Sequence, residues 1–283
     1  MFRRSVVGLA AVALVIASAL AVRKAAPADA ATISKPLRTA VALLPVAAEH
    51  RDGYERSRFK HWVDKDRDGC DTRREVLLAE AVAKPRRGSS CALTGGRWFS
   101  YYDGKYVRDA RELDVDHLVP LAEAWDSGAR NWTAQQREAF ANDLGDARSL
   151  VAVTNSVNRS KGDRDPTDWL PPQSSARCRY TEQWVAVKLR WKLRVDAAEK
   201  GTLTDLARGC ANRTITVRVA PATSNPTTST QPGGCSSAYP DFCIPPPPPD
   251  LDCADVAPHH NFTVRAPDPH GFDGNNNGRG CES

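Results

Sequence analysis

Two separated segments constrain the fold of this chain more than any other feature of its sequence. The first is Asp114-Val-Asp-His-Leu-Val-Pro-Leu121, which predicts a short strand that presents an acid and a histidine side by side. The second covers residues 149–165 and predicts a short apolar strand, Leu150 to Val153, followed by a polar turn or short helix. The polar side chains of that helix are Asn155, Asn158, Arg159 and Lys161. A carboxylate, an imidazole, an amide and basic groups brought together are the parts needed for metal-assisted phosphodiester hydrolysis.

The first thirty residues have the composition of a signal peptide. Arg3 and Arg4 precede an almost wholly apolar stretch, Val6 to Val22, and Ala28-Asp-Ala30 offers a cleavage site. The alternative is a membrane anchor, because the apolar stretch approaches the length that spans a bilayer. No later stretch is long and apolar enough to do so. We therefore expect a secreted protein with no integral membrane span, from which residues 1–30 are removed.

Eight cysteines in an exported chain predict a framework of disulfide bonds. A zinc site is the alternative, but the chain lacks the closely spaced Cys and His pairs that usually hold zinc. Neighbourhood in the sequence favours the pairs Cys70–Cys91, Cys178–Cys210, Cys235–Cys243 and Cys253–Cys281.

Composition divides the mature chain into three parts. Residues 31–210 hold 31 basic and 26 acidic residues, whereas residues 211–283 hold 4 basic and 7 acidic residues. Residues 211–250 are rich in Pro, Ser and Thr, which predicts a stiff linker of the polyproline II type. Residues 251–283 follow as a small module that we expect to fold independently of the body. A basic body with an acidic tail suits a polyanion-binding protein that carries a separate cation site.

The remaining elements of residues 31–210 are mixed, and the predicted fold class is α+β. Residues 31–63 look helical, and a further helix is expected from Thr72 to Lys84. Residues 97–107 predict a hairpin that turns at Asp103-Gly104. Its aromatic residues either form the core of the strands or stack bases.

A long amphipathic helix is expected to begin at Thr181. Its apolar face would be formed by Trp184, Val187, Trp191 and Val195. The other face would be either solvated or a track for phosphates, and it carries Lys188, Arg190, Lys192 and Arg194.

Two acidic loops have the spacing of calcium-binding loops. Within residues 64–75, the oxygen donors of an EF-hand pattern are Asp64, Asp66, Asp68 and Glu75. The alternative for this loop is a solvated acidic turn that caps the following helix. Near the end of the chain, a similar alternation predicts a calcium site formed by Asp273, Asn275, Asn277 and Glu282.

Two parts of the chain resemble known families. The segment D-V-D-H-L-V-P-L, followed by N-R-S-K-G-D-R-D-P-x-D-W, resembles secreted bacterial HNH-type endonucleases of the ββα-metal, or His-Me finger, superfamily. This resemblance implies a ββα-metal motif embedded in a mainly helical, disulfide-bonded nuclease domain at residues 31–210. The tail sequence D-x-N-x-N-G-x-x-C-E resembles the Excalibur module, a compact extracellular calcium-binding unit, and places it at residues 251–283.

The resemblance to HNH-type endonucleases also assigns roles to individual residues. His117 would be the general base, Asp116 and Asn158 would be the metal ligands, and Asp114 would be a supporting acid. The divalent metal would be Mg²⁺, with Mn²⁺ or Zn²⁺ as alternatives. Backbone phosphates would be contacted, without readout of the base sequence, by Arg159, Lys161 and Arg164. Ser149 stands where the family commonly has an asparagine, so the role that supports the catalytic loop is left unassigned.

The sequence thus predicts a secreted metal-dependent endonuclease, a hydrolase that cleaves DNA, with RNA as a second candidate substrate. Its C-terminal module would bind Ca²⁺ and could contact the cell envelope. One alternative is a catalytically inactive calcium-binding protein of the cell surface. Another is a phosphodiesterase that acts on a different extracellular polymer.

Overall fold

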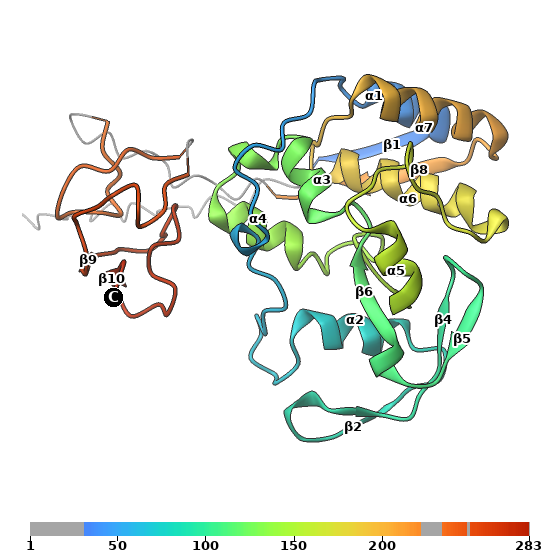
Figure 1. Cartoon of the computed structure of the whole chain (residues 1–283), viewed down its shortest axis with the longest axis horizontal. Helices are drawn as coiled ribbons and strands as arrows, with labels where there is room; N and C mark the ends of the chain where they lie inside the picture. The colour runs from blue at the N-terminus through green and yellow to red at the C-terminus, as the bar shows by residue number, and fades with distance from the viewer. Residues whose placement is uncertain (1–30, 222–233, 248–249, 283) are drawn as a thin grey trace, which may run out of the picture.

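The computed structural model describes residues 31–221, 234–247 and 250–282; the predicted signal peptide, residues 1–30, lies outside the described residues. The described chain has a body, residues 31–221, and a C-terminal unit formed by residues 234–247 and 250–282 (Figure 1). The body combines helices with two-stranded sheets, so the predicted α+β class is confirmed. No helix in the described part of the chain is both long and apolar enough to cross a membrane.

The centre of the body is an antiparallel pair of strands followed directly by a helix. β6 (Leu113–His117) pairs with β7 (Leu150–Thr154). α5 (Asn155–Lys161) starts at the residue after β7 and packs back onto both strands. All five residues of β7 are buried, which explains its continuous apolar sequence. The strand, strand and helix predicted from the two segments are confirmed.

The two faces of the β6–β7 pair contribute to different hydrophobic cores, because side chains alternate along a strand. Val151 and Val153 join the larger core. That core also contains residues of α1 (Leu37–Leu43), α3 (Leu121–Asp126), α6 (Arg177–Arg190) and α7 (Ala197–Gly209). Leu150 and Ala152 join the smaller core. It also contains residues of α2 (Thr72–Glu80), β4 (Trp98–Ser100) and β5 (Lys105–Val107).

Shorter elements complete the described structure. α4 (Ala134–Ala141) lies between β6 and β7 in the sequence and begins with a capping box made by Thr133 and Gln136. Three further antiparallel pairs are β1 (Thr32–Pro36) with β8 (Thr214–Arg218), β2 (Arg86–Arg87) with β3 (Leu93–Thr94), and β9 (Phe262–Thr263) with β10 (Arg279–Gly280). Single 3₁₀ turns are η1 (Arg56–Arg58), η2 (Ser89–Cys91), η3 (Ala110–Glu112), η4 (Ala129–Asn131) and η5 (Ser174–Ala176).

The predicted helical region at residues 31–63 is mostly not helical. Only α1 and the single turn η1 are helical there, and the chain begins with the strand β1. Prolines explain these boundaries. Pro36 directly precedes α1, and Pro45 follows it and cannot continue a helix because it lacks a backbone N–H.

The helix predicted for Thr72 to Lys84 is confirmed but shorter, since α2 ends at Glu80. The chain leaves the helix because the N–H groups of Val82 and Ala83 both donate to the Arg97 carbonyl, at 2.7 and 3.1 Å. The predicted hairpin follows as β4 and β5.

The start predicted for the long helix is wrong by about one turn. α6 begins at Arg177, and the Thr181 hydroxyl donates to the Arg177 carbonyl (2.8 Å) within the helix. Thr181 is therefore an interior residue and not a cap. The helix also ends at Arg190, so Lys192 and Arg194 lie beyond it.

Lys188 and Arg190 of α6 belong neither to a solvated face nor to a phosphate track. The Lys188 side chain is fully buried and pairs with Glu123 (2.5 Å) and Glu199 (3.1 Å). Arg190 is also buried and pairs with Asp143 (2.6 Å). Neither solvent exposure nor phosphate contact, the two predicted alternatives, holds for Lys188 and Arg190. Their carboxylate partners come from segments distant in the sequence, which the helical periodicity does not indicate.

All four predicted disulfide bonds are present, and the described residues contain no free cysteine. Two of them stabilise the body: Cys70–Cys91 ties the start of α2 to η2, and Cys178–Cys210 ties α6 to the end of α7. The other two, Cys235–Cys243 and Cys253–Cys281, lie within the C-terminal unit.

The bounds of the predicted linker, residues 211–250, are wrong at both ends. β8 lies inside that range and pairs with β1, so the body extends beyond Cys210. Ile215 and Val217 are buried while their neighbours are exposed, which is the alternation of an ordinary strand. At the other end, Tyr239 and Ile244 are buried in the core of the C-terminal unit. The rest of the predicted linker includes residues 222–233, which lie outside the described residues.

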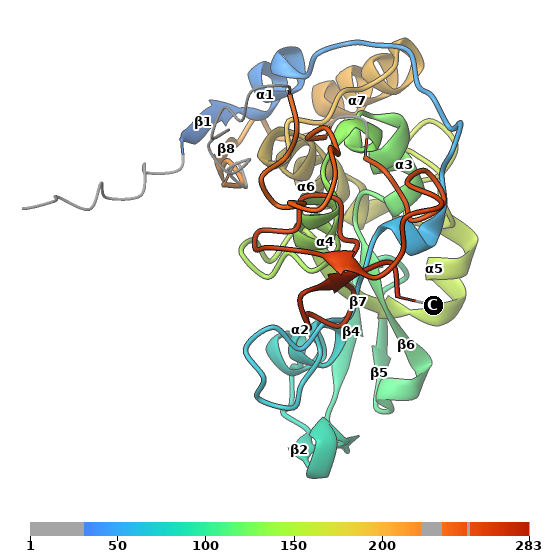
Figure 2. The same cartoon turned by 90° about the vertical axis from the view of Figure 1, so that its left-hand side faces the viewer.

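The C-terminal unit packs directly against α4 and η1 of the body, as Figure 2 shows for α4. Arg137 of α4 and Asp250 form an ion pair in which both side chains are buried. Arg58 of η1 pairs with Asp252 at 2.7 Å. The module expected to be tethered and independent is therefore in contact with the body through two ion pairs.

Glu80, the last residue of α2, is expected to make stability depend on pH. Its Oε2 accepts a hydrogen bond from the Ala152 N–H (2.8 Å), but burial raises the Glu80 pKa from 4.5 to about 7. Between these values the folded protein binds more protons than the unfolded chain, so stability falls as the pH rises through this window. Glu80→Gln keeps the acceptor and removes the charge. Urea unfolding is expected to show a gain of about 1–3 kcal/mol at about pH 8 and almost none at about pH 4. An equal gain at both pH values would contradict this assignment.

Candidate active site

Asp116 is fixed near the end of β6 by two donors from distant segments. Its Oδ2 accepts hydrogen bonds from the Tyr102 hydroxyl (2.7 Å) and from Nζ of Lys161 in α5 (2.5 Å). Lys161 also donates to the carbonyl oxygens of His117 and Leu118, both at 2.9 Å. Burial raises the pKa of Asp116 and lowers that of Lys161, and their ion pair opposes both shifts. Lys161 therefore holds the end of β6 against α5.

The prediction that Lys161 contacts a phosphate is wrong, because its side chain has no exposed surface. Val157 and Lys161 are four residues apart and lie on the face of α5 that packs on the strands. Arg159 lies on another face and is exposed, as is Arg164, whose Nε donates to the Lys161 carbonyl at 3.0 Å. These two arginines remain the candidates for phosphate contact on this segment.

Asn158 and Asp114 are brought together as the sequence predicts. Nδ2 of Asn158 donates to Oδ2 of Asp114 (3.1 Å), which fixes the orientation of the amide group. Asp114 and Asp116 alternate with Val115 along β6, so both carboxylates face α5. The Asp114 carboxylate thus orients the Asn158 side chain, and its role as a supporting acid stays a prediction.

Three oxygen atoms at this site have no hydrogen-bond partner among the described residues: Oδ1 of Asp114, Oδ1 of Asp116 and Oδ1 of Asn158. None of them is among the fully buried side-chain atoms that lack a partner in the described residues. Two carboxylate oxygens and one amide oxygen are hard donors, which suit Mg²⁺, Mn²⁺ or Ca²⁺.

His117 occupies the opposite face of β6 and is almost completely buried. Its Nε2 lies 2.8 Å from the Ala141 carbonyl oxygen at the end of α4. A carbonyl only accepts, so the neutral ring carries its proton on Nε2 and keeps the lone pair of Nδ1. Burial lowers the His117 pKa from 6.5 to about 3, so the imidazole is neutral at physiological pH. The rings of Trp62 and His61 lie beside it, with centroids 5.2 and 6.2 Å away.

A cavity of about 170 Å³ joins the two motif segments. Its polar lining includes Asp116, His117, Asn158, Arg159 and also Arg56. Arg56 could not be assigned to the site from the sequence, because it belongs to η1, in a charged stretch that carries no motif. The same holds for Tyr102, since an aromatic residue of a hairpin gives no sign that its hydroxyl will reach Asp116. Arg164 is not part of this lining.

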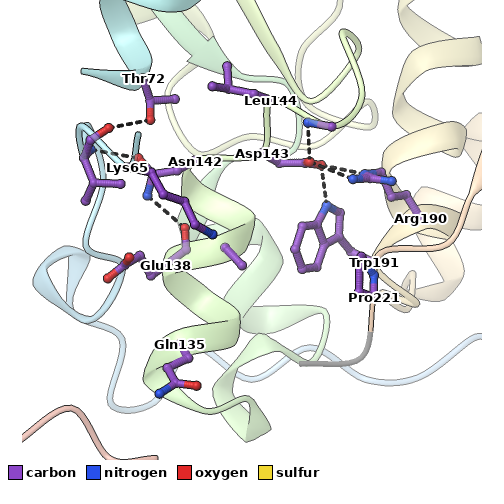
Figure 3. Close-up of a pocket in the computed structure, with 13 residues that line it drawn as sticks. Lys65, Thr72, Gln135, Glu138, Asn142, Asp143, Leu144, Arg190, Trp191 and Pro221 are labelled. Atoms are coloured by element: carbon purple, nitrogen blue, oxygen red, sulfur yellow. Dashed lines mark hydrogen bonds and ion pairs between the residues drawn. The ribbon is translucent and has the colours of Figure 1, made fainter. Parts of the chain in front are cut away.

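A larger cavity, of about 610 Å³, lies elsewhere on the body and contains none of the predicted site residues (Figure 3). Asp143 stands at its wall and accepts hydrogen bonds from Arg190 and Trp191.

Ser149 is hydrogen-bonded on both sides. Its hydroxyl donates to Asp143 (2.6 Å), and its carbonyl accepts from the Leu118 N–H (3.0 Å). Ser149 therefore anchors the chain that follows His117.

The loop at residues 64–75 brings three of its four predicted donors together. Carboxylate oxygens of Asp64, Asp66 and Asp68 lie within 4.8 Å of one another and are exposed. Glu75 stands apart in α2, where burial first and the nearby aspartates second raise its pKa. The Asp71 side chain accepts from the Arg74 N–H (2.9 Å) and caps α2, as the alternative predicted for an acidic turn. Cation binding by Asp64, Asp66 and Asp68 stays a prediction.

The four predicted donors of the tail loop also converge. Nδ2 of Asn275 and Nδ2 of Asn277 both donate to the Glu282 carboxylate, at 2.8 and 2.9 Å. The Asp273 carboxylate accepts from the backbone N–H groups of Asn277 (3.0 Å) and Gly278 (2.7 Å). Hydrogen bonds within the loop therefore hold these four residues together.

Residues 60–206 match the model of the family described as the C-terminal domain of GmrSD restriction endonucleases. The chain belongs to this family. The part that matches the GmrSD C-terminal domain contains β6, β7 and α5, and with them the cavity-lining residues named above except Arg56. A protein of Arthroderma benhamiae, described as an uncharacterized secreted protein, is 45% identical over 160 residues, which cover 56% of this chain and 77% of the relative. No solved structure matches the chain.

Proposed function

We propose that this member of the GmrSD C-terminal family is a secreted, metal-dependent endonuclease of the HNH type. It would hydrolyse phosphodiester bonds of nucleic acid without sequence preference, with β6, β7 and α5 as its ββα-metal motif. The proposal depends on one observation, the convergence of Asp116, His117 and Asn158 at a cavity that also has two exposed arginines. The description of the family and the secreted relative support a nucleic-acid substrate and an extracellular location.

The donor atoms fit a divalent cation held by Asp116 and Asn158, with Asp114 as the supporting acid. When bound, such a cation supplies positive charge that stabilises the developing charge on phosphorus and on the leaving oxygen. Mg²⁺ suits this set best, because it accepts a few protein oxygens and keeps several waters. Mn²⁺ and Zn²⁺ are the alternatives.

The residues of the chain supply the other requirements of the reaction. Nδ1 of His117 takes the proton of the attacking water while the water oxygen bonds to phosphorus and the bond to the sugar oxygen breaks. Arg56 and Arg159, exposed at the cavity, pair with phosphate oxygens, which are the same in every nucleotide. Lys161 does not contact the substrate but fixes Asp116 and the backbone of His117.

Plasmid cleavage over several metals tests the proposal. We expect cleavage with added Mg²⁺ that EDTA abolishes, and a higher metal requirement in Asp116→Ala and Asn158→Ala, because each variant loses one ligand. Asn155→Ala is the matched control, since Asn155 lies on the same helix but does not line the cavity. If a variant kept the wild-type metal dependence, the residue replaced in it would no longer be assigned as a metal ligand. If no metal supports plasmid cleavage, hydrolysis of another extracellular phosphodiester polymer or an inactive binding protein becomes the better description.

We further propose that the tail loop, an Excalibur-like site, binds Ca²⁺ outside the cell and so ties the protein to the cell envelope. Asp273 and Glu282 supply only two formal negative charges, and Asn275 and Asn277 add neutral oxygens, so the affinity should be low. A dissociation constant of about 10⁻⁴ to 10⁻³ M is expected, in the range of extracellular modules. Calorimetry of the full chain and of Asp273→Ala would measure it. Identical calcium titrations of the two proteins would remove the site from the tail.

A further inference from the structure

The outer face of the β4–β5 hairpin exposes two aromatic side chains that lie directly opposite each other. Phe99 and Tyr106 are cross-strand partners, with ring centroids 4.9 Å apart. Phe99 is 40% exposed and Tyr106 is 62% exposed, whereas Trp98 and Val107, the next pair along, are buried. In Figure 1 this hairpin lies on the side of the body away from the C-terminal unit, so that unit does not cover it.

Two arginines flank the aromatic pair on the same face. Side chains alternate along each strand, so Arg97 shares the face of Phe99 and Arg108 shares the face of Tyr106. Both arginines are exposed, and within the described residues neither forms an ion pair with a carboxylate. The Arg97 guanidinium lies 5.0 Å from the centre of the Tyr106 ring. Like charges gathered on one face are unfavourable unless an anion lies between them.

The hairpin is hydrogen-bonded to α2 and to Thr154, the residue that precedes α5. On its inner face, Nε1 of Trp98 donates to the Leu77 carbonyl (2.6 Å), and the Ser100 hydroxyl accepts from the Thr154 N–H (3.1 Å). The Asp103 carboxylate at the turn accepts from the Thr154 hydroxyl (2.7 Å). Thr154 precedes the helix that carries Asn158, so the exposed face keeps a fixed position relative to the candidate active site.

We propose that this face is a second nucleic-acid site, in which Phe99 and Tyr106 stack unpaired bases and Arg97 and Arg108 pair with the adjoining phosphates. Exposed aromatic rings and positively charged side chains are the two components of single-strand binding surfaces. Bases inside a duplex are already stacked, so the site selects single strands, frayed ends or loops. The proposal rests on the proposed function for its biological setting and adds a class of substrate to it.

Binding of a short fluorescein-labelled single-stranded oligonucleotide of mixed sequence, measured in EDTA, tests this site without any cleavage. Phe99→Ser/Tyr106→Ser is expected to weaken binding at least about tenfold, and Phe99→Trp/Tyr106→Trp to restore it. Val82→Ser is the matched control, because Val82 is 53% exposed on the segment that is hydrogen-bonded to the Arg97 backbone, and its loss removes exposed apolar surface but no aromatic ring. The small diester bis(4-nitrophenyl) phosphate reports the active site alone, and its hydrolysis is expected to stay unchanged in all these variants.

Unchanged oligonucleotide affinity in the double serine variant would overturn the proposal. Should that variant fail to fold, Tyr106→Ser alone takes its place, and unchanged affinity in it has the same meaning. Weaker binding with normal diester hydrolysis supports the second site. The wild-type protein could also fail to hydrolyse both plasmid and diester, which would contradict the proposed endonuclease activity. Weaker oligonucleotide binding by the double serine variant would still support the second site in that case. The two proposals are therefore tested separately.

Discussion

Replacing His117 by alanine is expected to lower the rate of plasmid cleavage by a factor of about 10² to 10⁴, the usual cost of losing a general base. His117 is held neutral by burial, and the Ala141 carbonyl fixes its proton on Nε2, which leaves Nδ1 to receive a proton. Among the residues that the structure describes, no other imidazole lines the candidate cavity. Metal affinity should stay nearly intact, because the proposed ligands are Asp116 and Asn158, and the metal dependence of residual cleavage would show this.

His61→Ala is the matched control for this experiment. Its ring lies next to that of His117, it is half-buried, and its Nδ1 lies 2.8 Å from the Phe59 carbonyl oxygen. The control should therefore cleave plasmid at close to the wild-type rate. If His61→Ala were the slow variant and His117→Ala retained wild-type activity, the general base would have to be reassigned.

The central strand, strand and helix could be predicted because their signals are local. The apolar run that forms β7 and the polar positions that follow it define their elements within a few residues. Asp116 and His117 at the end of β6 are adjacent in the sequence, so the pleat of the strand alone places their side chains on opposite faces. The four disulfides were also predictable, because each joins the nearest available cysteine.

The functions of the basic residues could not be predicted in the same way. Lys161, Lys188 and Arg190 look like exposed charges on helices, yet each is buried against a carboxylate from a distant segment. Whether a lysine meets solvent or a buried acid is decided by tertiary packing, which helical periodicity does not encode. Arg56 illustrates the converse, since it reaches the candidate site from a turn without any motif.

The contact made by the residue after the proline run could not be predicted either, for a related reason. Proline content reports a stiff backbone but not the surface on which that backbone lies. Asp250 directly follows the run of prolines and ends beside Arg137, and only 2% of the Arg137 side chain and 5% of the Asp250 side chain are exposed. Burial lowers the Arg137 pKa, and the carboxylate of Asp250 opposes this shift. The contact between the two parts of the chain therefore depends on a charge that has little contact with water.

Asp250→Ala is consequently expected to destabilise the protein by about 3–5 kcal/mol, the typical cost of leaving one partner of a buried ion pair uncompensated. Asp252→Ala is the matched control. Its partner Arg58 is 22% exposed and Asp252 itself is 52% exposed, so about 1 kcal/mol or less should be lost. Urea unfolding of the full chain measures both. The double variant Arg137→Met/Asp250→Leu should recover much of the loss, because it removes both buried charges together.

Asp250→Ala is also expected to slow plasmid cleavage. A C-terminal unit that is independent of the body would have no such effect. Nε of Arg137 donates to the Arg58 carbonyl (3.1 Å), and Arg58 belongs to the single turn that delivers Arg56 to the candidate site. When Asp250 is lost, Arg137 is free to leave that carbonyl, and the turn loses its support. Equal, small stability losses in Asp250→Ala and Asp252→Ala, with normal cleavage in both, would mean that the C-terminal unit does not dock in solution.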